Sequence, residues 1–208
     1  MNKLTVTTEV YQFDELTEQA KEVAREWWRE STYSNGFAWS EEYINSVKEG
    51  LEAFNAELKD YSIDCQNINC SSWTVKNNND NTDELTGQRL RKWLLNNYYS
   101  NFFERKPQGK YTKNEVTKKW NYKRRSRITY TETSCPFTGY CGDEDFMDVF
   151  RKFINNPDNS TLEELLNEAT EATFRALEAD CEHQLTDEYI DEVIEINEYE
   201  FTVDGKRY

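Results

Sequence analysis

The chain has 208 residues, of which 37% are apolar and 14% aromatic, and its 25 Lys+Arg and 40 Asp+Glu give a net charge of −15. This length allows one domain or two small ones, and the aromatic content indicates a folded chain with a thin core of Trp, Tyr and Phe rather than a disordered one. The acidic excess argues against plain electrostatic binding of nucleic acid or of an anionic membrane by the body as a whole.

The first half of the chain alternates between strand and helix patterns. Residues 3–13 alternate in polarity and are rich in Thr and Val, which predicts a strand. We expect Asp14 to cap a helix that runs to about Glu30, and Ser40 to cap the next helix, which runs to about Leu58. Four further segments follow: strands near 61–65 and 71–76, a polar loop at 77–83 and a helix over 84–103.

The second half begins with a basic stretch and ends with acidic helices. Two strands, or a ribbon with an Arg/Lys turn between them, are expected at 116–122 and 128–131. A turn-rich loop at 134–145 leads into a helix that starts at Asp143 or Asp145 and ends near 155–157.

Three start and turn signals mark the end of the chain. Thr161 and Glu164 form a capping box at the start of the longest helix, and Thr186 opens a shorter one. Asp204-Gly205 is the preferred centre of a two-residue hairpin turn. The pattern predicts an α+β fold, a helix-rich single domain over 1–208. Its small antiparallel sheet would combine the N-terminal strand, the middle strands and the C-terminal hairpin.

Residues 104–127 form a basic segment in an acidic chain. They carry ten Lys/Arg and two Glu, a charge of +8, and the rest of the chain carries −23. Three interpretations stay open: a clamp folded onto the acidic face, a phosphate-binding arm with stacking aromatic residues for RNA or single-stranded DNA, and a solvated hairpin tip. The candidate binding residues are Lys118, Lys119, Trp120, Lys123, Arg124, Arg125 and Arg127.

Residues 143–208 form an acidic helical subregion with 20 Asp/Glu and five Lys/Arg, a charge of −15. Carboxylates recur every three or four residues along its two predicted helices, which places neighbours about 4.5–6 Å apart along the axis. Such a row resembles the charge ladder of a nucleic-acid backbone, although it also suits a solvated surface that keeps a thin-cored protein soluble. The candidate partner-binding residues are Glu164, Glu168, Glu171, Glu188, Asp191, Glu192 and Glu195.

The sequence is poor in catalytic signals. It contains no Gly-rich phosphate loop, no dinucleotide fingerprint, no nucleophile elbow and no H-E-x-x-H motif. Its cysteine spacings, Cys65-x4-Cys70 and Cys135-x5-Cys141, are looser than a zinc knuckle, and His183 is the single histidine. The acidic cluster from Asp143 to Asp145 suits the dipole of a helix start better than a cation. We therefore expect no enzyme, no cofactor and no metal.

The opening YQFDELTEQAKEVAREWWRE resembles the start of a set of uncharacterised bacteriophage and prophage proteins, which begin with a strand, a Y-x-F-D-E-L motif and an A-K-x-x-A helix. The SCPFTGYCGDED loop and the terminal DEYIDEVIEINEYEFTVDGKRY also look like that group. The chain departs from the group after the second predicted helix, where Asn67 to Asn79 stand in place of a Gly-rich aromatic strand loop. The resemblance implies a phage accessory protein that binds a host machine, as anti-restriction and anti-CRISPR proteins do.

These observations lead to an expected function and an alternative. The expected function is inhibition of a host nucleic-acid-handling defence complex, such as a CRISPR effector, by steric block or nucleic-acid mimicry. The alternative is an RNA or single-stranded DNA binding module that uses residues 104–127. The expected partner is a host protein or ribonucleoprotein in the bacterial cytoplasm, with no membrane contact, because the chain has neither an apolar membrane span nor the apolar region of a signal peptide.

Overall fold

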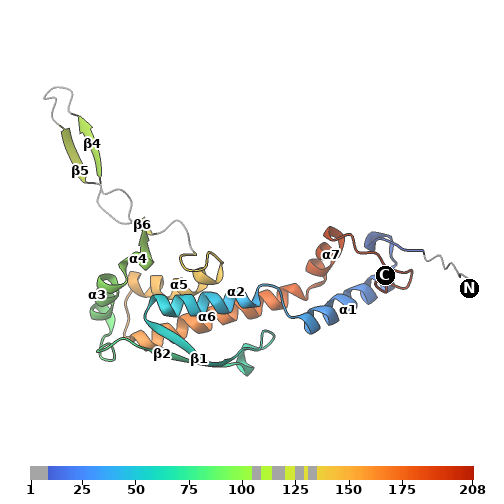
Figure 1. Cartoon of the computed structure of the whole chain (residues 1–208), viewed down its shortest axis with the longest axis horizontal. Helices are drawn as coiled ribbons and strands as arrows, with labels where there is room; N and C mark the ends of the chain where they lie inside the picture. The colour runs from blue at the N-terminus through green and yellow to red at the C-terminus, as the bar shows by residue number, and fades with distance from the viewer. Residues whose placement is uncertain (1–8, 105–108, 114–119, 125–128, 131–134) are drawn as a thin grey trace, which may run out of the picture. The chain divides into compact units, whose positions relative to one another are not determined.

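The computed structural model describes residues 9–104, 109–113, 120–124, 129–130 and 135–208 (Figure 1). Within them the fold is helix-rich with small two-stranded antiparallel sheets, which confirms the predicted α+β class. The chain groups into two compact units. The terminal unit comprises Met1–Ser40, Cys65–Asn67 and Leu177–Tyr208, and the central unit comprises Glu41–Asp64 and Ile68–Ala176.

The terminal unit begins with a short 3-10 turn, η1 (Phe13–Glu15), and helix α1 (Glu18–Asn35). The side chain of Thr17, not of Asp14, caps α1 by accepting a hydrogen bond from the backbone N–H of Ala20 at 3.3 Å. The predicted start at Asp14 is wrong because Leu16 is extended and separates η1 from α1. The helix also continues beyond the predicted end and stops at Gly36, whose φ is 91°.

The C-terminal hairpin joins the N-terminal segment through isolated bridges. Phe201 pairs in antiparallel fashion with Tyr11 on one side and with Arg207 on the other. Of the strand predicted at 3–13, residues 3–8 lie outside the described residues, and among the others only Tyr11 makes a bridge. The hairpin turn predicted with its centre at Asp204-Gly205 lies one residue earlier in the structure, because the N–H of Gly205 donates to the carbonyl of Thr202 at 2.8 Å.

The core of the terminal unit lies between the apolar faces of α1 and α7 (Asp187–Ile196), whose predicted cap, Thr186, is confirmed. Half-buried Trp27 packs edge-on against Tyr199 and Phe201, with ring centroids 5.5 and 5.9 Å apart. These rings attach the C-terminal hairpin to α1. The buried cluster consists of Phe13, Leu16, Ala20, Ala24, Ile190, Ile194 and Phe201.

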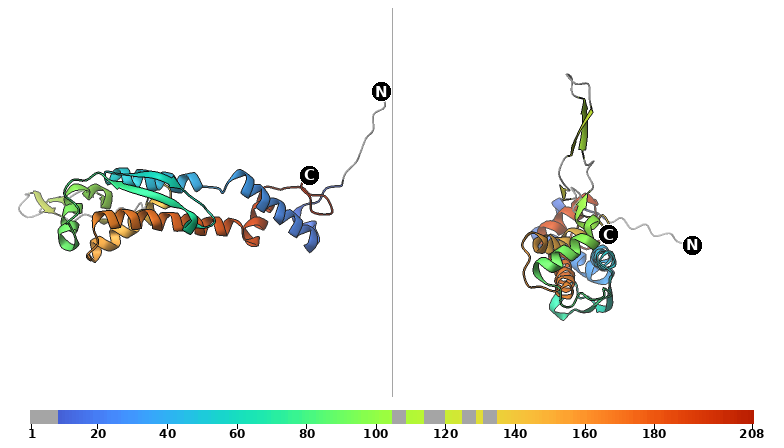
Figure 2. Two further views of the ribbon diagram at one scale, coloured as in Figure 1. Left: turned by 90° about the horizontal axis from the view of Figure 1, so that it is seen from below. Right: turned by 90° about the vertical axis from the view of Figure 1, so that its left-hand side faces the viewer.

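The central unit starts at the second residue of helix α2 (Ser40–Ala53). The antiparallel strands β1 (Ala56–Ser62) and β2 (Ser72–Asn77) follow, with the 3-10 turn η2 (Ile68–Cys70) between them. The prediction that α2 extends to Leu58 is wrong, since Asn55 has a φ of 54° and ends the helix. Asparagine tolerates this left-handed conformation better than most residues. Figure 2 shows both strands alongside α6 (Leu162–Gln184). The ring of Trp73 on β2 packs edge-on against the ring of Phe174 on α6, with centroids 5.2 Å apart.

Phenylalanine rings fill the core of the central unit. Phe54 stacks on Phe150 of α5 (Gly142–Asn155), with ring centroids 4.2 Å apart and planes 3° from parallel. The single helix predicted over 84–103 is instead α3 (Gly87–Asn97) followed by the short α4 (Tyr99–Phe102). The break falls at Tyr98, whose hydroxyl donates to Asn79 at 2.6 Å and thereby reaches the polar loop beside Phe54.

The described strands of the basic segment pair differently from the prediction. Strand β4 (Gly109–Lys113) pairs with β5 (Trp120–Arg124), whereas β3 (Phe103–Glu104) pairs with β6 (Thr129–Tyr130). The predicted ribbon between 116–122 and 128–131 is therefore wrong, although both of its strands overlap observed ones. The capping box predicted at the start of α6 is confirmed. The backbone N–H of Thr161 donates to the carboxylate of Glu164 at 2.8 Å, and the backbone N–H of Glu164 donates to the hydroxyl of Thr161 at 3.2 Å.

We expect Gly205→Ala to destabilise the protein by at least about 2 kcal/mol more than Gly36→Ala. Both glycines have positive φ, so both variants suffer the backbone strain of about 1–2 kcal/mol. A Cβ at position 205 would in addition lie 2.0 Å from the carbonyl oxygen of Ala20, whereas nothing lies within 4 Å of a Cβ at position 36. Urea unfolding of the two variants measures the difference, and equal losses would contradict the close approach of the turn to α1.

Candidate functional site

Helix α7 carries three kinds of side chain on three faces. Ile190 and Ile194 are buried in the core of the terminal unit. Asp187 and Asp191, four residues apart, meet arginines of α1. Glu188, Glu192 and Glu195 follow the spacing i, i+4, i+7, so they share a third face, and all three are exposed. The acidic character of α7 is thus divided between an internal ion-pair face and a solvent face.

The ion-pair face joins α7 to α1 through Arg25 and Arg29. The guanidinium of Arg25 donates through Nε and Nη2 to the two carboxylate oxygens of Asp191, both at 2.7 Å. The Arg25 side chain is only 14% exposed, and its hydrogen bond to Asp191 raises its pKa further. Arg29 pairs with Asp187, and also with Glu22 at 3.0 Å and Glu26 at 3.2 Å. The hydrogen bonds of a bidentate Arg–carboxylate pair such as Arg25–Asp191 are about twice as strong as neutral ones, and partial burial reduces their screening by solvent.

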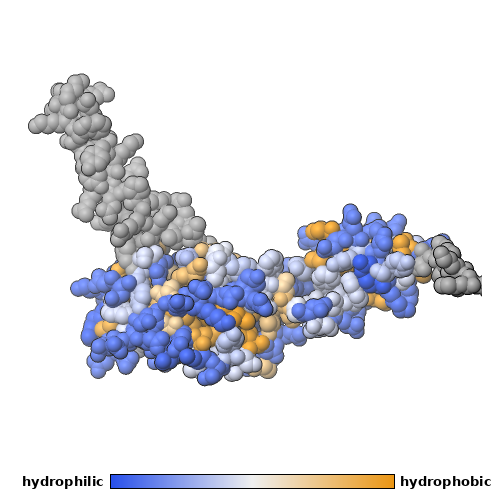
Figure 3. All heavy atoms as spheres, viewed as in Figure 1, coloured by the Kyte–Doolittle hydropathy of each residue, from blue (hydrophilic) through white to orange (hydrophobic). Residues whose placement is uncertain are grey.

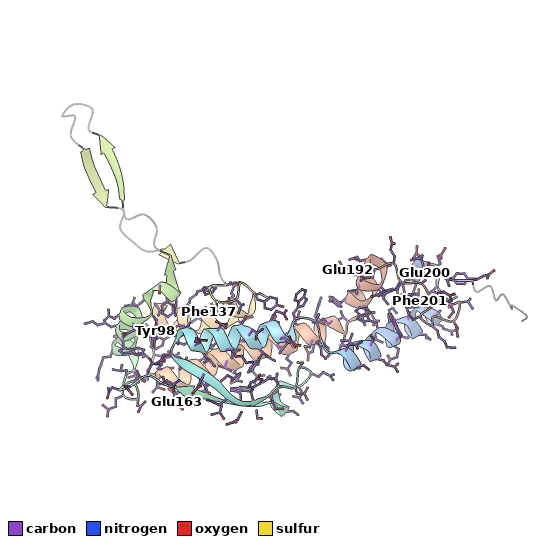
Figure 4. The ribbon with its side chains drawn as sticks, in the orientation of Figure 1. Tyr98, Phe137, Glu163, Glu192, Glu200 and Phe201 are labelled. Carbon is purple, nitrogen blue, oxygen red and sulfur yellow. The ribbon has the colours of Figure 1, made fainter. Side chains whose placement is uncertain are left out.

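The solvent face, which we call the α7 carboxylate stripe, consists of Glu188, Glu192 and Glu195. None of the three forms a salt bridge with any residue in the described part of the chain. Two more exposed carboxylates, Glu198 and Glu200, lie three and five residues after Glu195, and Figure 4 marks Glu192 on α7 and Glu200 beyond it. The stripe and these two residues form the candidate partner-binding surface of the terminal unit.

The α6 residues named by the sequence pattern lie in the central unit and have mixed roles. Glu164 is engaged in the capping box, and Glu171 pairs with Arg175 at 2.7 Å. Glu168 is exposed and has no salt bridge among the described residues. Together with Glu163 and Asn167 these residues line a shallow hollow of about 510 Å³. Figure 3 shows hydrophilic residues over much of the visible face of each unit, with apolar patches between them.

The predicted basic site is described only in its backbone. Trp120, Lys123 and Arg124 belong to β5, and the register places Lys123 opposite Lys110. The register also pairs Gly109 with Arg124. The remaining predicted residues lie outside the described chain: Lys118, Lys119, Arg125 and Arg127.

The acidic cluster at the start of α5 acts inside the protein. Asp143 is fully buried, and its carboxylate accepts the backbone N–H groups of Phe137, Thr138 and Gly139 at 2.7–3.1 Å. Asp145 is half-buried, and this burial, with the nearby negative charges, raises its pKa to about 6. Within the described residues no three His, Cys, Asp or Glu side chains come together as metal ligands.

The cysteine pairs suggested by the sequence are not the pair that the structure brings together. The five cysteines all lie in the described ranges and no disulfide joins them, while buried Cys181 lies in hydrogen-bond contact with Cys65 within the terminal unit. This hydrogen bond, and then burial, raises the pKa of the Cys181 thiol, which therefore stays protonated at neutral pH. A protonated, buried thiol is a poor nucleophile.

Sequence reasoning missed the arginines that neutralise part of α7. Arg25 and Asp191 are separated by 166 positions in the chain, so no local pattern connects them. The available signal was the alternation of Glu22, Arg25, Glu26 and Arg29 along α1, which marks a charged helix face. Asp191 consequently belongs to the framework rather than to the free stripe.

Comparison with known proteins adds no assignment, since no family model matches the chain, and neither a curated protein nor a solved structure matches it. None of the helices in the described ranges combines the length and apolar character needed to cross a membrane.

We expect Asp191→Ala to lower the free energy of unfolding by about 1–3 kcal/mol, because the mostly buried guanidinium of Arg25 loses its bidentate partner. Glu192→Ala is the matched control on the next position of the same helix, and we expect it to change stability by less than about 0.5 kcal/mol. Chemical denaturation of both variants is the measurement. A loss for Glu192→Ala as large as that for Asp191→Ala would contradict the division of α7 into a framework face and a free face.

Proposed function

We propose that the protein is a phage-encoded inhibitor that binds a host nucleic-acid-handling defence complex in the bacterial cytoplasm, such as a CRISPR effector. The α7 carboxylate stripe occupies a basic surface that otherwise holds DNA or RNA. The observation that carries this proposal is that Glu188, Glu192 and Glu195 keep one face of α7 unneutralised, while Arg25 and Arg29 take up the neighbouring carboxylates.

The spacing of the stripe supports mimicry of a phosphate backbone. Residues four and three apart on a helix are separated by about 6 and 4.5 Å along its axis. These spacings are of the same order as the roughly 3.4 Å between successive charges on one nucleic-acid strand. The stripe is also held in place by α7's bidentate pairing with α1, so little order has to be gained on binding.

An exposed apolar side chain beside the stripe favours a protein partner over a purely ionic one. Ile196 is 71% exposed and follows Glu195 directly, four residues after Glu192. Apolar anchors surrounded by charged residues are typical of protein interfaces, in which charge steers the approach and the buried apolar group slows dissociation. Inhibition by steric block is therefore compatible with the same surface.

The stripe is tested by reversing its charges. We expect the triple variant Glu188→Lys, Glu192→Lys, Glu195→Lys to lose at least about tenfold in affinity for the effector, because three favourable contacts become repulsive. The assay measures displacement of a fluorescent nucleic acid from the purified effector, at about 50 and 200 mM salt.

The matched control changes the net charge equally at another place. Asp80→Lys, Asp83→Lys, Glu84→Lys alters three exposed residues in one loop of the central unit. Retained displacement by this control, together with loss in the stripe variant, supports mimicry. Equal effects of the two triple variants would refute it.

One observation favours the alternative function, binding of RNA or single-stranded DNA by the basic segment. The β4–β5 register places Lys110 opposite Lys123, and like charges at opposed positions of a ladder are unfavourable unless an anion lies between them. The same register pairs Tyr111 with Tyr122, and aromatic residues among cations suit stacked bases.

Gel shifts with single-stranded RNA and DNA test this alternative. If it holds, we expect binding at about 50 mM salt that weakens at least tenfold at about 200 mM, because contacts with phosphates release counterions. Lys110→Glu with Lys123→Glu should abolish the shift, and the α7 stripe variant should retain it. The absence of a shift at both salt concentrations would remove the alternative and leave the inhibitor proposal in place.

A further inference from the structure

A groove lies in the central unit between α2 and the loop that precedes α5. Its volume is about 460 Å³, and it is far from closed, so it suits a chain segment that lies across it better than an enclosed small molecule. The lining combines carboxylates, an amide and aromatic rings: Glu42, Asn45, Glu49, Phe137, Thr138 and Tyr140. Figure 4 marks Phe137 in this loop beside α2.

The loop that forms one wall is rigidly anchored. The carboxylate of Asp143 accepts three consecutive backbone N–H groups of the loop and the Thr138 hydroxyl, the last at 2.8 Å. The Thr138 hydroxyl also contacts Ser46 of α2 at 3.1 Å and accepts the N–H of Tyr140 at 3.1 Å. The buried carboxylate of Asp143 thus fixes the loop on α5, and Thr138 connects the loop to α2. The groove is therefore preformed before any ligand binds.

The aromatic walls are held by rings of the core. Tyr140 packs edge-on against buried Tyr43, with centroids 5.1 Å apart, and Phe137 packs edge-on against buried Phe146 at 6.1 Å. Phe137 and Tyr140 are themselves half-buried, so part of each ring stays open to the groove. The face of a partly exposed aromatic ring can stack against a planar cation such as a guanidinium.

The opposite wall carries negative charge on one face of α2. Glu42, Asn45 and Glu49 follow the spacing i, i+3, i+7, and the two glutamates have no salt bridge among the described residues. Two helical turns separate them by about 10 Å along the axis. In a segment with polyproline II conformation, which is extended and has three residues per turn, side chains three residues apart lie on the same face and are separated by about 9 Å.

We propose that this groove binds a short extended segment of a partner protein that carries two arginines three residues apart. A guanidinium stacks on aromatic faces and pairs with carboxylates through two parallel hydrogen bonds, whereas an ammonium does neither as well. The groove therefore selects arginine over lysine. This surface is separate from the α7 carboxylate stripe and is tested independently of it.

The test titrates the isotope-labelled full-length protein with Ac-Arg-Gly-Gly-Arg-NH2 and with Ac-Lys-Gly-Gly-Lys-NH2, followed by NMR. We expect the arginine peptide to shift the amide signals of Asn45, Thr138 and Gly139 at millimolar concentration, and the lysine peptide to bind at least threefold more weakly. Equal binding of the two peptides overturns the assignment of a guanidinium site.

Two charge-neutralising variants and one matched control locate the site. Glu42→Gln and Glu49→Gln should each weaken binding of the arginine peptide at least threefold. Glu41→Gln, on the same helix but outside the groove, should leave it unchanged. Tyr140→Leu should also weaken binding, and the two glutamate variants carry the test if that variant is unstable. Equal losses in all of these variants, Glu41→Gln included, would overturn the proposal.

The absence of peptide binding to the natural chain also overturns the proposal. So does binding that appears only after residues 105–127 are replaced by a Gly-Ser segment of equal length. That outcome would identify the chain's own basic segment, rather than a partner, as the occupant of the groove.

Discussion

The arrangement of the terminal unit depends on the bidentate ion pair between Arg25 and Asp191. It joins α1 to α7 across 166 positions of sequence, with both hydrogen bonds at 2.7 Å and the arginine mostly buried. A charge held in this way requires a partner, because an unpaired buried guanidinium is costly. Once Asp187 and Asp191 turn toward α1, the helical period directs Glu188, Glu192 and Glu195 elsewhere. The exposed stripe is therefore a geometric consequence of the internal pairing.

A second constraint, the buried carboxylate of Asp143, plays the corresponding part in the central unit. Three backbone N–H groups and one hydroxyl satisfy it, so the loop from Phe137 to Gly139 has little conformational freedom. In sequence, this aspartate belongs to a run of three acidic residues at a helix start, where a favourable interaction with the helix dipole is the usual explanation. Its fully buried position shows that one member of the run fixes a loop, and this could not be inferred from composition.

The helices were largely predictable, because apolar periodicity and caps are local signals. The capping box of Thr161 and Glu164 and the cap at Thr186 are confirmed at the predicted residues. The errors arose where one residue's conformation decided the outcome, as at Asn55, whose positive φ ends α2 early. Strand pairing was less predictable, since the choice of β4 rather than β6 as the neighbour of β5 depends on contacts between separate segments.

The sequence predicted which segments of the candidate surfaces are charged, but not which of their side chains are free to meet a partner. Carboxylates at helical spacing identify acidic faces, but the same spacing includes Asp191, Glu164 and Glu171, which are engaged within the protein. A partner interacts mainly with the carboxylates that are not paired within the protein, because a carboxylate already paired with a guanidinium contributes little electrostatic field at a distance. The strength of any mimicry therefore depends less on the net charge of −15 than on where the fold leaves carboxylates unpaired on one exposed face. Acidic proteins of equal charge can differ in binding for this reason alone.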